Sequence, residues 1–593
     1  MIQTLQFGPI TMRAAMPADR PYVIAGPRMY AIGMMSGAPP RIGAEHLIGE
    51  MGGLWAHPIK ALNAWRFAIE VPGAAEEVDS FEGAFWKVTR TRHAGGLRIS
   101  ETEWVAEDEP VLVVEIVVVN TSGVEVLAQA AFDATPCLKP CWMSPMLDGD
   151  DTLTRNSRSI RAADALHPGW GVAVLADGDL AQTLRLAPGE AFRMNVAVAA
   201  VLEGGPDAAE DLAALLLHQR EARRVRKENA YRDVLDRGLP TSGSHLRDAH
   251  LCALLNIKLL EAVNFSGRYA MAGLPEYPNL FGCDIAYSVP GLIAAGRSDL
   301  AQSALEALRV VVLRQAGRVP HEVLPDGSVF PPGNTQESPQ FVIAAHALWR
   351  AMASSDAIAD AFYPACRAAI LNHLRAGFTW STSAYPDYPH GNAMIEREGM
   401  LALKLDSVCY THRALRCLEE MACAWQARRP SLQVADDLRR IAAWAVAIEA
   451  GFERDWWIEE AGLYADSLGY DGVRRLDRHW TQIVPLETGL ASPEHAARVL
   501  DAVEAEWLNA DGLPHTKDIE ERVWTLPTGL LALVAARSGR PGLAERLLRN
   551  IAMTLQSGQL GLFEELIPNG LCFAQLWSAA LFAQILEEVN GMK

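Results

Sequence analysis

The chain has 593 residues, of which 50% are hydrophobic, and its formal net charge at pH 7 is −19. This length predicts two domains, and the composition is that of a folded protein rather than a disordered one. The negative charge argues against nucleic acid and against an anionic membrane surface as partners, because the sequence has no basic stripe to neutralise phosphates.

The first 205 residues have the pattern of short strands. β-Branched and aromatic runs, separated by turns rich in Gly and Asp, occupy residues 84–91, 97–105, 111–119 and 192–201. Several short strands joined by polar turns predict an antiparallel β-sandwich over residues 1–205. The next stretch, 206–240, is highly charged and has leucines on one side only, which predicts a linker helix lying against both neighbouring domains.

Residues 241–593 contain about a dozen apolar segments at helical spacing, and many of them open with Ser, Asp or Pro. Short connections, such as 295–298 and 537–540, alternate with long ones, such as 319–336 and 380–401. A closed ring of helical hairpins produces this alternation, with short turns on one rim and long, site-building loops on the other. Because no repeat of fixed period supports an α-solenoid, we expect an (α/α)6 barrel.

The cysteine pattern and the N-terminal segment favour a cytoplasmic protein. The nine cysteines are scattered without regular spacing, which is typical of reduced, buried thiols. Residues 1–20 lack the continuous apolar core of a signal peptide, and the apolar stretch 111–119 is too short to span a bilayer. Cys137 and Cys141 lack the second Cys or His pair of a zinc site.

A loop near the C-terminus carries two adjacent carboxylates. Glu564 and Glu565 lie in the Gly-flanked segment 561–570, directly before an apolar helix with a Gln-x-Trp-Ser motif at 575–578. A tight loop at a helix start holds a carboxylate at a fixed depth in a pocket, as a general base requires.

This segment resembles the C-terminal end of the glucoamylase and glycogen-debranching type of (α/α)6 glycoside hydrolase. In that family a G-x-x-P-E-[LQ] loop delivers the base just before a Gln-x-Trp-Ser helix. Glu565 falls at the acidic position of the family motif, and Glu564 replaces the usual Pro. The resemblance implies that Glu565 is the general base, with Glu564 as the alternative.

A second segment, 279–292, resembles the F-G-R-D-[ST] motif of the same family, in which the Asp and the Arg bind sugar hydroxyls in subsite −1. Asp284 matches the motif and is also a suitable helix N-cap, whereas Cys283 replaces the Arg. The bidentate clamp on sugar hydroxyls is therefore missing, and the substrate can differ from plain glucosides.

The loop 379–392 holds the candidate general acid, Asp387, between Tyr385 and Tyr388. The two rings lower the local dielectric, and desolvation raises the pKa of a carboxyl group toward the value that a general acid needs. The related hydrolases place their acid in an aromatic-flanked loop at this position, although the W-x-D-[AS] wording of the family motif is absent here. Tyr385 is also a candidate substrate contact.

Three other carboxylates compete with Asp387. Glu396 and Glu398 flank Arg397 and have the pattern of a solvated charge cluster. Asp406 lies within an apolar helical pattern, which favours a buried, hydrogen-bonded role.

The remaining long loops supply further candidates for substrate contact. Glu337 opens a hydrophobic helix, where the helix dipole stabilises it with or without a sugar. Trp480 and Trp524 are candidate stacking walls, and each also fits an ordinary core position. His479 and His515 have no carboxylate at metal-binding spacing, so we expect hydrogen-bonded histidines and no metal.

The resemblance implies a glycoside hydrolase that acts on a carbohydrate without a cofactor. The resemblance implies inversion, because the related families invert: Asp387 would protonate the leaving oxygen while Glu565 activates water. A separation of about 6.5–9.5 Å between the two carboxylates would agree with inversion, and roughly 5 Å with retention. The alternatives are a glycoside phosphorylase, a sugar epimerase on the same barrel, and a non-catalytic glycan-binding protein. The sugar, the linkage and the oligomeric state stay open.

Overall fold

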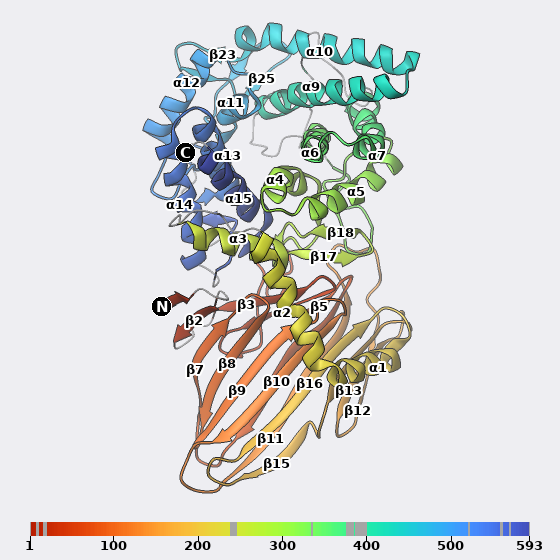
Figure 1. Ribbon diagram of the computed structural model, residues 1–593, viewed down its shortest axis with the longest axis vertical. Coiled ribbons are helices and arrows are strands. Elements are labelled where there is room, and N and C mark those ends of the chain that lie inside the picture. The colour runs from red at the N-terminus through yellow and green to blue at the C-terminus, as the bar shows by residue number, and fades with distance from the viewer. Residues whose placement is uncertain are drawn as a thin grey trace.

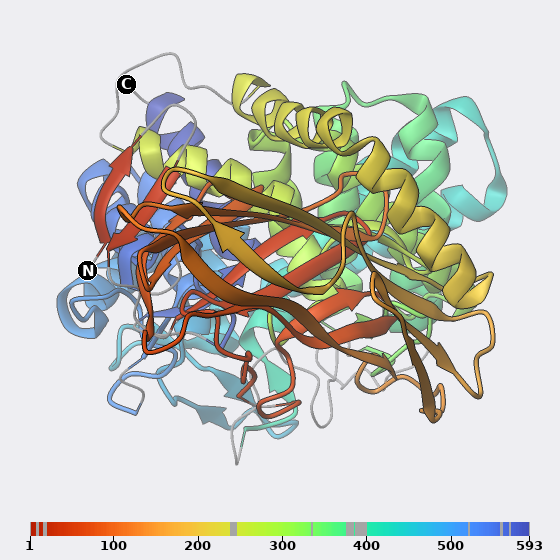
Figure 2. The same ribbon diagram turned by 90° about the horizontal axis from the view of Figure 1, so that it is seen from below.

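The computed structural model of the chain describes residues 2–6, 11–15, 20–44, 46–237, 246–333, 336–374, 385, 400–519, 522–557, 561–567 and 571–591. Two β-sheets lie at one end of the long axis and a ring of helices lies at the other (Figure 1). Seen from the sheet end, the strands lie in front of the helices (Figure 2).

Two antiparallel sheets form the N-terminal part. The first sheet has ten strands in the spatial order β1 (Ile2–Gln6), β2 (Thr11–Ala15), β7 (Glu76–Gly83), β8 (Lys87–Ala94), β9 (Leu97–Val105), β10 (Val111–Asn120), β16 (Ala191–Val201), β14 (Gly171–Ala176), β13 (Ser159–Asp164) and β12 (Asp151–Arg155). The second has six strands in the order β15 (Ala181–Leu186), β11 (Val126–Pro140), β6 (Ile59–Glu70), β5 (Gly53–Ala56), β4 (Met29–Met34) and β3 (Pro21–Gly26). Burial alternates along β8 and β11, as it does when one face of a strand packs into a core. The predicted antiparallel sandwich is confirmed.

The stretch predicted as one linker helix is two helices, α1 (Gly205–His218) and α2 (Arg220–Arg237). The break lets α1 follow β14 and β16 while α2 crosses toward the helical ring (Figure 1). The ammonium group of Lys227, in α2, donates to the Ala25 carbonyl (2.7 Å) and to Glu107 of the sandwich (2.9 Å). The prediction of a single helix was wrong because periodicity along the chain does not reveal where a helix must change direction to stay against two surfaces.

Twelve helices of the described part of the chain form two concentric rings. The inner ring consists of α4 (Gly282–Ala294), α6 (Glu337–Ala351), α9 (Leu405–Arg428), α11 (Val484–Thr488) with the 3₁₀ turn η2 (Trp480–Ile483), α13 (Thr525–Arg537) and α15 (Leu576–Gly591). The outer ring consists of α3 (Arg247–Leu259), α5 (Ser298–Arg314), α7 (Asp356–Arg367), α10 (Leu432–Trp456), α12 (Pro493–Ala502) and α14 (Pro541–Ser557). Two π-helical turns, η1 (Ala368–Leu374) and η3 (Val503–Trp507), extend α7 and α12.

The inner ring closes where α15 packs against α4. The two backbones approach so closely that a Cβ atom on Gly291 would lie 2.0 Å from the Ala580 carbonyl oxygen, so only glycine fits. This closure confirms the predicted (α/α)6 barrel.

Short strand pairs hold the beginnings of the inner helices together at one end of the barrel, here called the mouth. They are β19 (Gly273–Leu274) with β29 (Ala574–Gln575), β20 (Leu280–Phe281) with β21 (Glu322–Val323), β22 (Leu403–Lys404) with β25 (Ser467–Leu468), and β27 (Val523–Trp524) with β28 (Leu566–Ile567). Four inner helices, α4, α9, α13 and α15, start directly after such a strand. Three further pairings, β17 (Glu261–Asn264) with β18 (Gly267–Ala270), β23 (Trp457–Ile458) with β24 (Leu463–Tyr464), and β26 (Arg474–Arg475) with β25, complete the described strands. The long loops therefore gather at the mouth, while short turns such as 295–297 lie at the opposite end.

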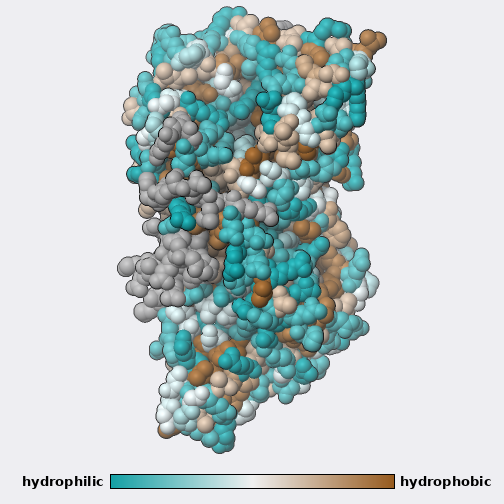
Figure 3. Space-filling view, in the orientation of Figure 1, coloured by the Kyte–Doolittle hydropathy of each residue, from teal (hydrophilic) through white to brown (hydrophobic). Residues whose placement is uncertain are grey.

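The surface is consistent with the charge of the chain. Hydrophilic side chains cover most of the face seen in Figure 3, and the hydrophobic ones are scattered over it. Among the helices that the structure describes, none combines the length and the apolarity needed to cross a membrane.

Candidate active site at the barrel mouth

Three inner helices each carry a buried carboxylate in their first turn. These residues are Asp284 in α4, Glu337 in α6 and Asp406 in α9, and each is at most 4% exposed. The positive end of a helix dipole favours a negative charge at this position. Because the first turns of neighbouring inner helices lie side by side, the ring places these carboxylates together at one mouth.

Asp284, a predicted substrate contact, is held between two inner helices. Its Oδ1 accepts a hydrogen bond from Gln575 at the start of α15 (3.0 Å), and its Oδ2 accepts one from the Cys283 thiol (3.1 Å). Burial raises the pKa of Asp284 to about 6, although both hydrogen bonds and the nearby His321 oppose the rise. The side chain is therefore fixed in position and partly neutral near pH 6.

Glu337, another predicted contact, faces a histidine that the sequence analysis did not single out. Nδ1 of His321 lies 2.6 Å from Oε1 of Glu337. Burial lowers the pKa of His321, but the hydrogen bond and the charge of Glu337 outweigh it, so the net change is upward. The Cys283 thiol lies beside this pair, and its pKa is raised by burial and by the charges of Asp284 and Glu337.

Asp406 also lies at the mouth, where the sequence analysis had given it a buried, hydrogen-bonded role. Its Oδ2 accepts a hydrogen bond from Gln336 at the start of α6 (3.2 Å), and its Oδ1 accepts one from the backbone of Ser407 (2.7 Å). Burial raises its pKa to about 6. Asp284 and Asp406 share one local pattern, because each lies in the first turn of a helix that directly follows a residue in extended conformation. This shared pattern was the signal that could have placed Asp406 at the mouth.

The loop with Glu564 and Glu565 is fixed by α13 and α15. The Glu565 carbonyl accepts hydrogen bonds from the backbone and the hydroxyl of Thr525, both at 3.0 Å, and the Glu564 carbonyl accepts one from Ser578 (2.9 Å). Oε2 of Glu565 accepts a hydrogen bond from the Cys572 backbone (3.3 Å). Both carboxylates are 2% exposed, so the structure holds each of the two candidate bases rigidly at the mouth.

The predicted aromatic contacts have different surroundings. Trp524 is partly exposed, and its ring centroid lies 6.3 Å from that of Trp577. Trp524 immediately precedes α13, whose first residue, Thr525, donates to the Glu565 carbonyl. Trp480 is 1% exposed and packs in the hydrophobic core. Tyr385 donates a hydrogen bond to Asp455 (2.8 Å) at the end of the outer helix α10. The structure thus brings Trp524, of these three, close to the acidic loop.

Asp387, the predicted general acid, lies outside the described residues, as do Glu396 and Glu398.

Comparison with known proteins identifies the fold of the chain. No protein-family model matches the chain, and no curated protein matches it in sequence. The crystal structure of a bacterial glucoamylase complexed with acarbose superposes with a TM-score of 0.64 and 10% identity, covering 97% of this chain and 94% of that one. The chain has the glucoamylase-type fold. A putative kojibiose phosphorylase from the human microbiome shares this fold, with a TM-score of 0.63 and 10% identity over 98% of this chain and 89% of that one. At such identity the likeness shows the fold and not the reaction.

The sandwich of this glucoamylase-type fold contacts the mouth through a loop that the sequence analysis did not identify. His46 stacks on Trp142 with ring centroids 4.3 Å apart, and its Nδ1 lies 3.2 Å from the buried Glu276 of the barrel. Trp55 and His57 do not take part in this contact, because they pack against the ring of Tyr30 within the sandwich. Sequence gave no sign of His46 because the contact joins segments about 230 residues apart.

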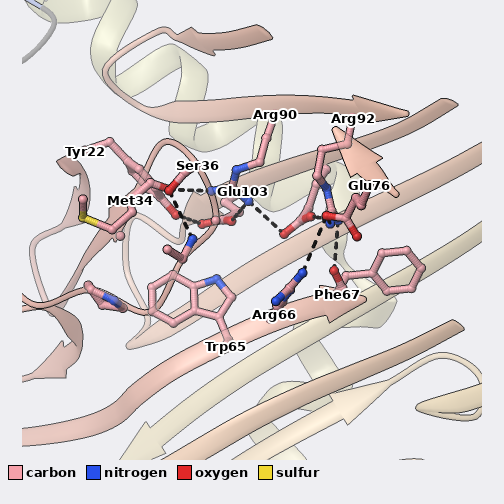
Figure 4. A pocket seen from close by; sticks show the side chains of 15 residues that line it. Tyr22, Met34, Ser36, Trp65, Arg66, Phe67, Glu76, Arg90, Arg92 and Glu103 are labelled. Atoms are coloured by element: carbon pink, nitrogen blue, oxygen red, sulfur yellow. Dashed lines mark hydrogen bonds and ion pairs between the residues drawn. The ribbon is translucent and has the colours of Figure 1, made fainter. Parts of the chain in front are cut away.

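A polar cavity of about 250 Å³ lies within the sandwich rather than at the mouth (Figure 4). Arg90 and Arg92 project into it and pair with Glu101, and Arg90 also lies 3.6 Å from Glu103. Figure 4 shows Arg90 turned toward Glu103, and Arg92 turned toward Glu76. Since the charges compensate each other, the network has the character of a paired buried cluster.

Proposed function

We propose that this chain is a glycoside hydrolase that cleaves an O-glycosidic bond at the barrel mouth with inversion. The observation that carries the proposal is the set of buried carboxylates from α4, α6, α9 and the 561–567 loop, gathered at one end of the barrel. Carboxylates are strong acceptors for hydroxyl donors, so the mouth suits a polyhydroxylated substrate. The two structural neighbours described above are named for activity on glycosides, and one was solved with acarbose bound.

The roles follow the resemblance and the hydrogen bonds. Glu565 is proposed as the general base that activates water, and Asp284 as the acceptor for sugar hydroxyls, kept in position by Gln575. Asp387 is proposed as the general acid on the strength of its aromatic-flanked loop. Asp406 is the second candidate acid, because a carboxyl group with a pKa near 6 retains a proton at mildly acidic pH.

A glycoside phosphorylase is the second candidate, favoured by the full-length likeness to the putative kojibiose phosphorylase. In that reaction phosphate attacks directly and a general base is not needed. The bonds that fix the loop of Glu564 and Glu565 support the hydrolase, since a phosphorylase gains nothing from a positioned base.

Sugar release from a panel of α- and β-linked glycosides, with and without phosphate, tests the proposal. The native chain should release free sugar without phosphate, and Glu565→Gln should lower kcat at least about 10³-fold at an unchanged melting temperature. Glu564→Gln is the matched control, because it makes the same change one residue away. A loss in Glu564→Gln alone would exchange the two roles, and equal turnover in all three proteins would refute the base assignment. Release of a sugar phosphate only when phosphate is present would select the phosphorylase.

The general acid is identified with activated aryl glycosides, whose leaving groups depart without protonation. Asp387→Asn should lose activity on ordinary glycosides and keep it on the aryl substrates, while Asp406→Asn should not show this selectivity. The reverse pattern would assign the acid to Asp406. The anomer formed first, observed by NMR, distinguishes inversion from retention.

A further inference from the structure

One cluster at the mouth combines a thiol, an imidazole and a carboxylate. The Sγ atom of Cys283, a ring nitrogen of His321 and a carboxylate oxygen of Glu337 all lie within 4.8 Å of one another. In the part of the chain that the structure describes, this is the one group of three or more such side chains with a spacing suited to a metal ion.

The three side chains are brought together by interlocked backbone segments rather than by a mobile surface. Phe281 of β20 pairs with Glu322 of β21, and the Gly282 amide donates to the His321 carbonyl (2.8 Å). The Phe281 ring meets the His321 ring edge-on at 5.4 Å, which restricts how the imidazole can turn. The cluster is therefore preorganised, as a ligand set must be if it is to bind an ion tightly.

Burial gives the cluster one open side. Cys283 and Glu337 are 6% and 2% exposed, whereas the His321 side chain is 32% exposed. Two ligands thus lie in the protein interior, and the third borders an accessible space through which an ion and water can enter.

The charge at the mouth favours a cation there. Buried carboxyl groups concentrate at this end of the barrel, among them Glu276, Asp284, Glu322, Glu337, Asp406, Glu564 and Glu565. Removing carboxylates from water costs free energy unless a positive charge compensates them. A divalent ion held by Cys283, His321 and Glu337 supplies positive charge at this end of the barrel.

We propose that Cys283, His321 and Glu337 bind a divalent transition-metal ion of the zinc class. A cysteine ligand selects against Mg²⁺ and Ca²⁺, and three protein ligands from Cys, His and Glu suit a four-coordinate zinc site whose fourth position is open to water or a substrate hydroxyl. On binding, the Cys283 thiol and the His321–Glu337 hydrogen bond each release a proton to solvent. The ion then takes the place of that hydrogen bond and of the one from Cys283 to Asp284. The sequence analysis predicted no metal. It did not reveal this site because Cys283 and His321 are 38 positions apart and form no metal-binding sequence motif. Metal binding does not depend on the proposed hydrolase reaction; a contact between the ion and a sugar hydroxyl does.

Metal content and cobalt spectroscopy of the full-length protein test this site without substrate. After dialysis against excess Zn²⁺ and removal of free metal, elemental analysis should find one zinc per chain. Cobalt substitution should produce a thiolate-to-cobalt charge-transfer band and the strong visible bands of a tetrahedral ion. Cys283→Ser should abolish the charge-transfer band and weaken zinc binding at least about 100-fold, because loss of an outer-shell partner alone costs up to that much.

Two further variants keep the test decisive. Glu337→Gln should keep the charge-transfer band with weaker affinity, and it supplies the readout if Cys283→Ser does not fold. Cys423→Ser removes an exposed thiol and should bind zinc as the native chain does. The proposal is overturned if the native chain holds no stoichiometric metal, if Cys283→Ser binds as tightly as native, or if Cys423→Ser removes the binding. Failure of the glycosidase assay alone would leave the metal result intact and would refute only the proposed function.

Discussion

Replacing Asp406 by Asn should stabilise the barrel at neutral pH. The side chain is 2% exposed, and burial raises its pKa from 3.8 to about 6. A carboxyl group with a raised folded-state pKa favours the protonated form in the fold, so it destabilises the protein increasingly as pH rises from about 4 through 6. At about 1.36 kcal/mol per pKa unit, the charged group costs at most about 3 kcal/mol above pH 6. Asparagine carries no charge and so removes this cost. Its side-chain oxygen still accepts a hydrogen bond from the Ser407 backbone amide, and its side-chain NH2 group donates to Gln336 once the side-chain amide of Gln336 has flipped.

Thermal melting at pH 7.5 and pH 4.5 measures the effect. We expect Asp406→Asn to melt about 2–4 °C higher than native at pH 7.5, which corresponds to about 1–3 kcal/mol, and to differ little at pH 4.5. Asp437→Asn is the control of opposite sign, because Asp437 is equally buried but accepts a charged hydrogen bond from Arg367 at 2.6 Å. It should lose about 1.5–3 kcal/mol at pH 7.5. A lower melting temperature for Asp406→Asn, or a gain that persists at pH 4.5, would show that its ionisation is not the source of strain.

Gly291→Ala should destabilise the barrel by about 2 kcal/mol or more, because its Cβ would lie 2.0 Å from the Ala580 carbonyl oxygen. Gly542→Ala is the control and should be neutral or stabilising, because open space surrounds Gly542; urea unfolding compares the two variants. Burial lowers the pKa of His57 to about 3, so the native state resists protonation of this side chain and stability falls as pH drops from about 6.5 toward 3. His57→Gln should therefore move the midpoint of acid unfolding to a lower pH, and an unchanged midpoint pH would contradict this. Trp524→Ala should raise KM for the best substrate several-fold with a smaller change in kcat, and an effect on kcat alone would place the ring outside the binding surface.

The fold could be predicted because its signals are local. Alternation along strands such as 97–105 and 111–120 and the 3.6-residue period of the later helices are properties of short windows, and they survive packing. The prediction of one linker helix failed at Gln219, where the chain bends to remain in contact with both the sheet and the barrel. That bend depends on surfaces that local periodicity does not describe.

The candidate site was predictable where the chemistry lies in one continuous segment. The paired acids Glu564 and Glu565 and the motif around Asp284 were identified because each is adjacent to a helix start in sequence. Asp406 was assigned a buried, hydrogen-bonded role because its apolar neighbours resemble those of any core helix. Trp480 shows the converse, since an aromatic residue at the start of an inner helix packs into the core.

By itself the sequence determined the order of the sandwich and the barrel, the alternation of short and long connections, and two segments that carry acidic residues. Only the tertiary structure decided which side chains meet: Gln575 with Asp284, Gln336 with Asp406, and His321 with Cys283 and Glu337. The reason is that closing the ring joins helix starts separated by up to about 290 residues. Hydrogen bonding and the proposed metal ligation depend on distances of a few ångströms, and only the packing of one inner helix against the next sets those distances.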